Sequence, residues 1–242
     1  MARSGVIVVG DIHGEWAPLN ALIAKKKPDI ILQTGDFGWW LPYHNTRVLG
    51  STRNDGPWNQ YGLKSGDTKI YWADGNHEHF WSLKEDVIKP NKLEIMPNVF
   101  YQPRGSILTL PDERNVLFMG GADSIDKEHR KLGIDWFPDE VLTEADVYSV
   151  PDDSKIDIVI SHTGTVDMCG ALMKVLDPWK QQKNNDPSRL GLQFIFERFR
   201  PTFWYFGHFH MFMSGSIRGC HWTTLDMPQH VGRWWMNLPE RK

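Results

Sequence analysis

Groups of potential metal ligands follow five separate apolar segments of the sequence. Each group comes directly after a glycine or a serine and offers a carboxylate, an amide or an imidazole. These residues are Asp11, His13, Asp36, Asn76, His162, His208 and His210. Oxygen and nitrogen donors without sulfur suit Mn²⁺, Fe or Zn²⁺ better than copper(I) or an iron–sulfur cluster. Seven donors exceed what one ion takes from a protein, so the sequence predicts two divalent ions, Mn²⁺ being favoured, that share a carboxylate and leave positions for water and substrate.

The spacing within these groups supports convergence. In extended chain, residues two positions apart point the same way, so Asp11 and His13 can face one ion together, as can His208 and His210. A glycine before a ligand allows unusual backbone angles and a close approach to other groups. We therefore expect the backbone to pass close to the ions at these positions.

Buried strands must place these residues. Short apolar runs, rich in β-branched and aromatic residues, immediately precede the ligand groups and are typical of central strands in an α/β sheet. They span residues 6–9, 30–32, 69–72, 156–160 and 202–206. Helical spacing of apolar residues predicts helices at 18–27 and 190–198. Because the carboxyl ends of the strands in such a sheet line one crevice, we expect the polar groups to meet at one edge.

The remaining chain has weaker patterns. Residues 93–119 hold short apolar segments broken by prolines and glycine, which favours antiparallel strands and a source for a second sheet. Residues 45–67 are polar and lack periodicity, so we expect a long excursion near the site. No repeat or linker divides the 242 residues, and we expect a single domain over 1–242.

Bulk properties exclude several classes of protein. The formal net charge of −3 argues against broad electrostatic capture of nucleic acid or acidic membrane. The two cysteines lie far apart and outside any CxxC pattern, which indicates a reducing compartment rather than a disulfide framework. The N-terminal apolar run is too short for a signal peptide, and no stretch is long enough to span a membrane. We expect a cytoplasmic protein without membrane contact.

The ligand groups occur in the order D-x-H, G-D, G-N-H-E, H and G-H-x-H, and this pattern resembles the calcineurin-like metallophosphoesterase family. The resemblance spans residues 11–210 and implies an α/β fold, a two-sheet sandwich flanked by helices in four αββα layers. It also implies how the ligands divide. Asp11, His13 and His210 would hold one metal, Asn76, His162 and His208 the other, and Asp36 would bridge both.

The family resemblance implies hydrolysis of phosphate esters. Two cations lower the pKa of a bridging water, and the resulting hydroxide attacks phosphorus in line with the leaving group. His77, beside the ligand Asn76, would donate a proton to the departing oxygen or stabilise its charge, and Glu78 or another carboxylate would orient the imidazole. Two aspartates offset only part of the four positive charges, so the site would attract phosphate.

Two departures from the family pattern favour a phosphodiesterase over a protein phosphatase. Phe37 and Gly38 follow Asp36, and Asp74 precedes Gly75, so neither block carries the arginine that clamps a phosphate group. Arg130 is a candidate for a substrate-binding arginine from elsewhere. The alternatives are a phosphomonoesterase with the same site and a non-catalytic scaffold protein that keeps the fold.

Trp39 and Trp40 follow Asp36 closely and could stack on a base, which would suit nucleotides or nucleic acid as substrates. Packing in the core is the competing interpretation, because tryptophan is mainly a core and interface residue. The other histidines match no block and are interpreted as surface or structural residues. They are His44, His79, His129, His221 and His230.

Overall fold

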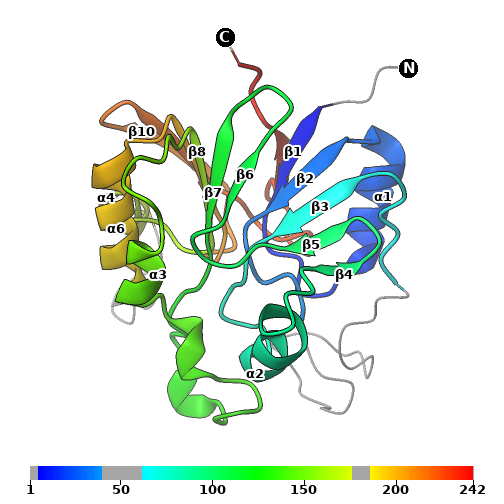
Figure 1. Ribbon diagram of the computed structural model, residues 1–242, viewed down its shortest axis with the longest axis horizontal. Coiled ribbons are helices and arrows are strands. Elements are labelled where there is room, and N and C mark those ends of the chain that lie inside the picture. Colours follow the sequence, from blue (N-terminus) through cyan, green and yellow to red (C-terminus); the bar gives the residue numbers. More distant parts are fainter. Residues whose placement is uncertain (1–4, 40–61, 176–185, 242) are drawn as a thin grey trace.

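Two mixed β-sheets of six strands each form the centre of the computed structural model, and helices cover their outer faces (Figure 1). The structure describes residues 5–39, 62–175 and 186–241. The strand order is β12-β1-β2-β3-β5-β4 in the first sheet and β10-β11-β9-β8-β7-β6 in the second. This is the predicted two-sheet sandwich.

In each sheet, four parallel strands lie between two antiparallel edge strands. The first sheet contains β1 (Val6–Val9), β2 (Ile30–Gln33), β3 (Lys69–Trp72) and β5 (Val99–Tyr101), with β4 (Glu94–Met96) and β12 (Trp235–Asn237) at its edges. The second contains β7 (Asn115–Met119), β8 (Ile158–Ser161), β9 (Phe203–Phe206) and β11 (Cys220–Thr224), with β6 (Ile107–Thr109) and β10 (Met213–Ile217) at its edges.

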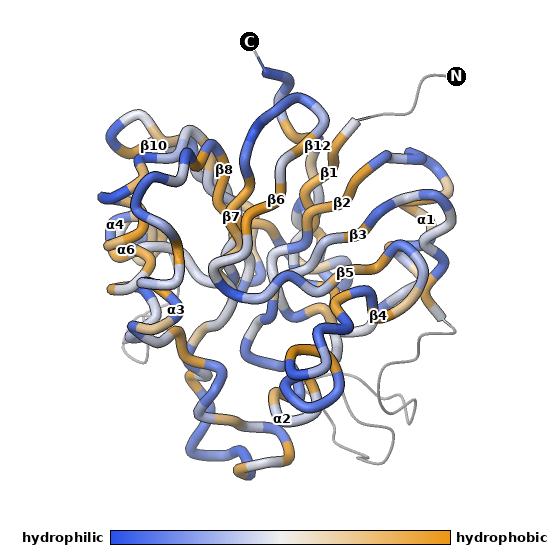
Figure 2. Tube along the Cα trace, viewed as in Figure 1, coloured by the Kyte–Doolittle hydropathy of each residue, from blue (hydrophilic) through white to orange (hydrophobic). Residues whose placement is uncertain are grey.

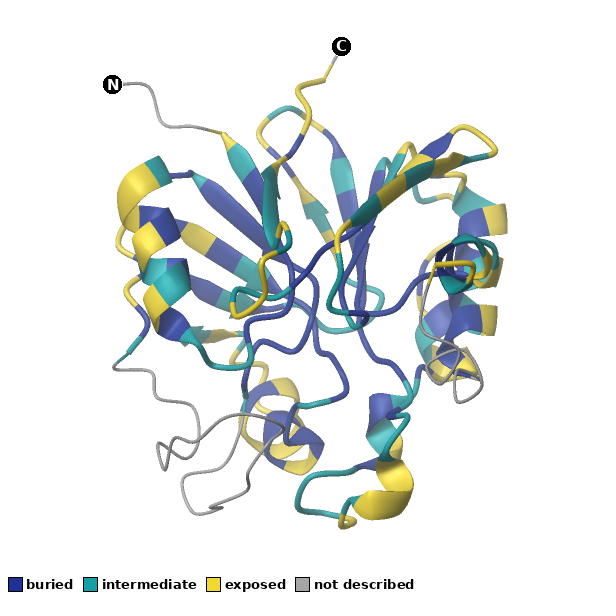
Figure 3. Ribbon diagram, turned by 180° about the vertical axis from the view of Figure 1, so that it is seen from behind, coloured by how far each residue is buried: buried dark blue, intermediate teal, exposed yellow. Residues whose placement is uncertain are grey.

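Strand periodicity divides the apolar side chains into three layers. Val8 of β1 and Phe118 of β7 belong to the layer between the sheets, whereas the adjacent Val9 and Met119 belong to the two outer layers. Successive side chains of a strand point to opposite faces, which is why both faces of each sheet are apolar. The central strands are mainly apolar and buried, whereas exposed residues are concentrated on the helices, the loops and the edge strands (Figures 2 and 3).

Helices fill the outer layers. On the first sheet, α1 (Trp16–Lys26) buries Leu19, Leu22 and Ile23, and α2 (Phe80–Ser82) continues into the π-helix η1 (Leu83–Ile88). The second sheet is covered by α3 (Glu144–Tyr148), α4 (Val166–Met173) and α6 (Ser188–Phe199). Two 3₁₀ turns, η2 (Lys127–His129) and η3 (Pro138–Glu140), lie in the segment between β7 and α3.

The five predicted strands and both predicted helices are present, with ends shifted by a few residues. The expectation that the strands share one sheet edge was wrong, because β1, β2 and β3 belong to the first sheet and β8 and β9 to the second. The region 93–119 supplies both sheets, since β4 and β5 join the first and β6 and β7 the second. Most of the excursion predicted at 45–67 lies outside the described residues. Among the described helices, none has the length and apolar character needed to cross a bilayer.

Candidate metal centre

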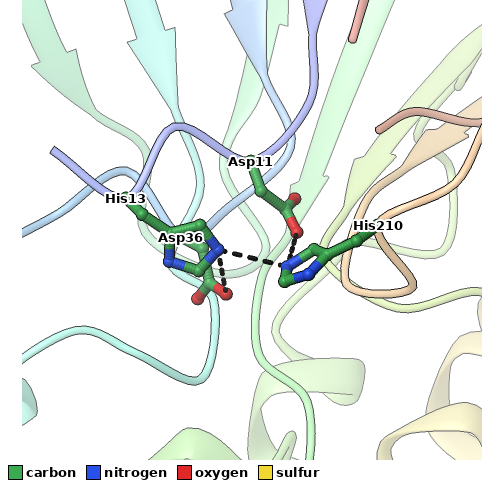
Figure 4. Close-up of side chains that lie close together, drawn as sticks. All are labelled: Asp11, His13, Asp36 and His210. Atoms are coloured by element: carbon green, nitrogen blue, oxygen red, sulfur yellow. Dashed lines mark hydrogen bonds and ion pairs between the residues drawn. The ribbon is translucent and has the colours of Figure 1, made fainter. Parts of the chain in front are cut away.

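The loops after β1, β2 and β9 bring together the first donor group, which consists of Asp11, His13, Asp36 and His210 (Figure 4). Their potential ligand atoms all lie within 4.8 Å of one another. His210 Nε2 is 3.1 Å from Asp11 Oδ2 and 3.2 Å from His13 Nε2. His13 Nε2 is 3.6 Å from Asp36 Oδ2.

The loops after β2, β3, β8 and β9 bring together the second donor group, which consists of Asp36, Asn76, His162 and His208. Asn76 Oδ1 is 3.0 Å from His162 Nε2 and 3.0 Å from His208 Nδ1. His162 Nε2 is 3.3 Å from Asp36 Oδ2. Asp36 Oδ2 is therefore next to donors of both groups.

Both donor groups fit a metal ion. Ligands bound to one ion at 2.0–2.2 Å lie about 3.0–3.4 Å from each other in tetrahedral or octahedral geometry, and the closest donor pairs here have such separations. Asp11 Oδ1 is buried and has no hydrogen-bond partner among the described residues. A buried carboxylate oxygen without a donor is unusual, and a cation would satisfy it.

The backbone is strained at four of the seven predicted ligands. His13, Asp36, His208 and His210 have φ angles of 48°, 53°, 66° and 48°. Left-handed backbone is uncommon for residues other than glycine and concentrates at functional sites, where the surrounding structure holds it in place. The four strained residues lie in the loops directly after the strands, where the two donor groups come together.

Two glycines allow the carboxylates to approach the backbone. A Cβ atom at Gly207 would overlap the Asp11 carboxylate, and a Cβ atom at Gly75 would overlap that of Asp36. This agrees with the expectation that glycines before the ligands permit close packing. Any side chain at either position would displace an aspartate.

Asp36 and His162 lie next to each other in the interior, and their pKa values shift in opposite directions. Burial alone would raise the pKa of Asp36, but the imidazoles of His162, His77 and His13 hold it well below its ordinary value. Burial opposes protonation of His162, but the carboxylates of Asp36 and Asp11 raise its pKa. Burial lowers the pKa of His13 and of His208. Neutral imidazole is the form that binds metal, and the lowered pKa values of His13 and His208 favour that form.

His77 lies beside the first donor group, where its ring packs edge-on to that of His13. His77 Nε2 is 3.9 Å from Asp36 Oδ2, and the backbone N–H of His77 donates to Asp36 Oδ1. Burial and then the charge of Arg130 lower the pKa of His77 well below its usual range, against the opposing effect of Asp36. Arg130 Nη2 is 3.2 Å from His77 Nε2, so the structure brings this arginine to the site.

Glu78 is buried and binds backbone groups. Its carboxylate accepts from the N–H of Gly38 at 3.1 Å and from the N–H of Gly75 at 2.5 Å. Burial and the neighbouring Asp36 raise the pKa of Glu78 to about 8. These contacts join the loop that carries Asp36 to the loop that carries Asn76.

Trp39 is half-buried and packs against the outer core of the first sheet, and its indole N–H donates to Ser82 Oγ at 2.9 Å. Trp40 and His44 lie outside the described residues. His79 is buried at the start of α2, and His129 and His221 are exposed.

The sequence patterns did not single out several residues around the centre. The exposed His230 packs edge-on to the His210 ring, and its Nδ1 is 2.9 Å from Oδ1 of the buried Asp226. The signal for this pair is its i,i+4 spacing, which is too common to be informative.

Three buried polar contacts were also not indicated by the sequence patterns. Asn76 donates to Ser124 Oγ, and Ser124 donates in turn to Glu140. Asp74 Oδ2 accepts two hydrogen bonds from one guanidinium, from Arg104 Nε at 3.0 Å and from Arg104 Nη2 at 2.8 Å. Each contact joins residues far apart in the chain, which no local pattern reveals.

Comparisons with known proteins agree with this geometry. The family model described as calcineurin-like phosphoesterase matches residues 5–212. A search of curated protein sequences found no significant match.

Among solved structures, TT1561 of Thermus thermophilus is 11% identical with a TM-score of 0.54, covering 92% of this chain and 88% of that one. Phosphopantetheinyl hydrolase from Mycobacterium tuberculosis is 11% identical with a TM-score of 0.56, covering 98% and 97%. A provisionally assigned 5′-nucleotidase from Staphylococcus aureus is 14% identical with a TM-score of 0.52, covering 92% and 48%. At this level of sequence identity, the similarity to the three structures shows a shared fold.

Proposed function

Because this chain belongs to the calcineurin-like phosphoesterase family, we propose that it is a dimetal-dependent hydrolase of phosphate esters that prefers diesters to monoesters. The observation that carries the proposal is the presence of two donor groups that meet at Asp36 Oδ2. The first donor group would hold one divalent ion and the second donor group the other, with Mn²⁺ favoured over Fe or Zn²⁺. Such ions, when bound, make water more acidic and withdraw charge from the phosphoryl oxygens.

His77 and Arg130 are the groups of the chain that would act on the substrate. A guanidinium can only donate, so Arg130 donates to His77 Nε2 and the proton of the neutral ring lies on Nδ1. A phosphate beside them would accept from Arg130 and free Nε2. The ring could then take up a proton at Nε2 from solvent and pass it to the departing oxygen, or change tautomer so that its single proton lies on Nε2 and forms a hydrogen bond to that oxygen.

Glu78 has a supporting role in this proposal. Its two bonds to backbone N–H groups hold the loops of Asp36 and Asn76 against each other, and the His77 backbone is bound to Asp36 in turn. Glu78 would therefore orient His77 through the backbone of the 75–78 loop.

The diester preference rests on the composition of the loops. Phe37 and Gly38 follow Asp36, and Asp74 precedes Gly75, so the residues next to Asp36 and Asn76 in the sequence include no arginine for a dianionic phosphate. The position of Arg130 favours the second candidate, a phosphomonoesterase, because a guanidinium beside His77 could bind the additional charge of a monoester.

Nucleotides or nucleic acid are the substrates that we propose for the diester reaction. The support is the position of Trp39, whose backbone carbonyl accepts from the N–H of His79 close to the centre, and of Trp40 next to it in sequence. We also propose one domain over residues 1–242 and a reducing, cytoplasmic setting, which the free buried thiols of Cys169 and Cys220 support.

The test compares bis-nitrophenyl phosphate with nitrophenyl phosphate, using protein loaded with Mn²⁺ and protein treated with a chelator. We expect metal-dependent hydrolysis with the larger kcat/KM on the diester. A larger value on the monoester would establish the second candidate instead. Metal-loaded protein that is inert on both esters, and on a wider ester panel, would support the scaffold alternative.

A further inference from the structure

We propose that Ser124 and Glu140 are positioning residues that hold the carboxamide of Asn76 with its oxygen, rather than its nitrogen, toward the second donor group. The inference deepens the proposed function and rests on the proposed metal centre. It assigns a task to a segment between β7 and α3 that supplies none of the seven ligands.

The contacts form a continuous buried chain. Asn76 Nδ2 donates to Ser124 Oγ at 2.9 Å, and Ser124 Oγ donates to Glu140 Oε2 at 3.0 Å. The backbone N–H of Ser124 donates to Glu140 Oε1 at 2.7 Å, and Trp136 Nε1 donates to the same oxygen at 3.1 Å. Asn76, Ser124 and Glu140 are 3%, 1% and 0% exposed, so water does not replace these bonds at low cost.

Donor and acceptor alternate in a fixed order along these hydrogen bonds. This order determines which end of the Asn76 amide faces the second donor group. The two ends of an asparagine carboxamide have nearly the same shape, so hydrogen bonding decides its orientation. A carboxylate only accepts, and Glu140 therefore makes the Ser124 hydroxyl a donor. That leaves Ser124 Oγ as an acceptor for Asn76, which directs Nδ2 to Ser124 and Oδ1 to His162 and His208.

Arg104 holds the segment of Glu140 in place at the end of this series of hydrogen bonds. Arg104 Nη2 donates to the backbone carbonyl of Glu140 at 3.2 Å and to Asp74 Oδ2 at 2.8 Å. Asp74 lies two residues before Asn76, so one guanidinium joins the ligand loop to the segment that carries Glu140. Groups that orient a metal ligand in this way typically contribute a factor of about 10–100 in metal affinity.

The experiment measures Mn²⁺ binding to the purified full chain by titration calorimetry and by the EPR signal of free Mn²⁺. It is done at pH 8, because burial raises the pKa of Glu140 to about 7 and the carboxyl group is then mainly ionised. The variants are Ser124→Ala, which removes the acceptor, Ser124→Thr, which restores a hydroxyl, and Glu140→Gln. In Glu140→Gln, the two N–H groups that donate to Oε1 would keep the amide oxygen in that place and turn its NH₂ toward Ser124. The Ser124 hydroxyl would then no longer have to donate to residue 140, so the Asn76 amide would lose its fixed orientation.

Ser65→Ala is the matched control, because Ser65 is also buried and its hydroxyl donates to the carbonyl of Pro97, which lies in the turn between β4 and β5 and outside both donor groups. We expect wild type and Ser65→Ala to bind two ions equally well. Ser124→Ala and Glu140→Gln should bind one ion normally and the other about 10–100-fold more weakly, and Ser124→Thr should recover most of the affinity.

Unchanged affinity for both ions in Ser124→Ala and in Glu140→Gln would overturn the inference. Equal weakening of both ions would do so too, since it would indicate a general structural role. If Ser124→Ala does not fold, judged by circular dichroism, Glu140→Gln and Ser124→Thr decide the matter. Wild-type protein that binds no metal would instead refute the proposed function, so the two failures are distinguishable.

Discussion

Arg130 Nη2 lies 3.2 Å from His77 Nε2, although 53 positions separate the two residues in the chain. Arg130 Nε is also 2.8 Å from Asp126 Oδ1, and its side chain is only 8% exposed. A guanidinium held at this position is preorganised for an anion beside His77, because little side-chain freedom is lost on binding.

Arg130→Ala should lower kcat/KM on the monoester by roughly 10–100-fold, the amount expected for a lost charge-assisted hydrogen bond. The diester carries one negative charge less, so the effect on it should be smaller. Steady-state kinetics on both esters measure the difference. Lys127→Ala is the control, because its ammonium pairs with Asp123 and is half exposed. Equal losses on both esters would argue that Arg130 does not discriminate between them.

Asp36→Asn should reduce binding of both ions, because Asp36 Oδ2 adjoins both donor groups. Asparagine tolerates the left-handed backbone at this position, so the substitution tests the charge rather than the conformation. The loss of affinity should exceed the roughly 10–100-fold typical of groups around the ligands. Metal analysis after dialysis measures it, and His221→Gln, an exposed histidine, serves as the control. Retention of both ions by Asp36→Asn would contradict a shared carboxylate.

The seven predicted ligands could be read from the sequence because each lies within four residues of the end of a strand with a recognisable apolar pattern. The division of the strands between two sheets was not predictable, since β3 and β8 have the same apolar character whichever sheet they join. Contacts such as those between Asn76 and Ser124, or Asp74 and Arg104, depend on how loops from different strands meet. Local patterns contain no such information, whereas they do contain the period of a strand or a helix.

Arg104→Met should destabilise the fold by about 3–5 kcal/mol, because it leaves the buried carboxylate of Asp74 without its charge partner. Urea unfolding, followed by circular dichroism, measures the change. Arg241→Met is the matched control, since Arg241 and Glu113 form a pair at the surface and such pairs contribute about 0–1 kcal/mol. Similar losses in the free energy of unfolding in both variants would show that the buried Arg104–Asp74 pair contributes no more than a surface pair.

Replacing Trp39 and Trp40 together by alanine should raise KM for substrates that contain a base much more than for a small aryl diester, if these residues stack on the base. Trp39 also packs against the core and donates to Ser82, so some loss of stability is expected as well. Trp39→Phe retains a ring and tests packing separately. An equal rise in KM on both kinds of substrate would remove the stacking role.

Cys169 and Cys220 should not react with Ellman's reagent in the native protein at pH 8, because burial raises their thiol pKa to about 11 and about 12. The thiolate is the reactive form, and at pH 8 it amounts to about one part in a thousand or less. Both thiols should react after unfolding. Since the unfolded thiols ionise near pH 9, unfolding should become easier as the pH rises from there toward 11. Rapid labelling of the native protein would contradict the burial.

The split of the ligands between the two sheets has a consequence for biosynthesis. Asp11, His13, Asp36 and Asn76 follow β1, β2 and β3 of the first sheet and are synthesised early, but His162, His208 and His210 follow strands of the second sheet. A nascent chain that stops short of residue 208 therefore has an incomplete set of donors in both donor groups, because it lacks His208 and His210. Loading of the proposed metal centre would thus be a late event in the maturation of this protein, because both donor groups need residues that follow strands of both sheets.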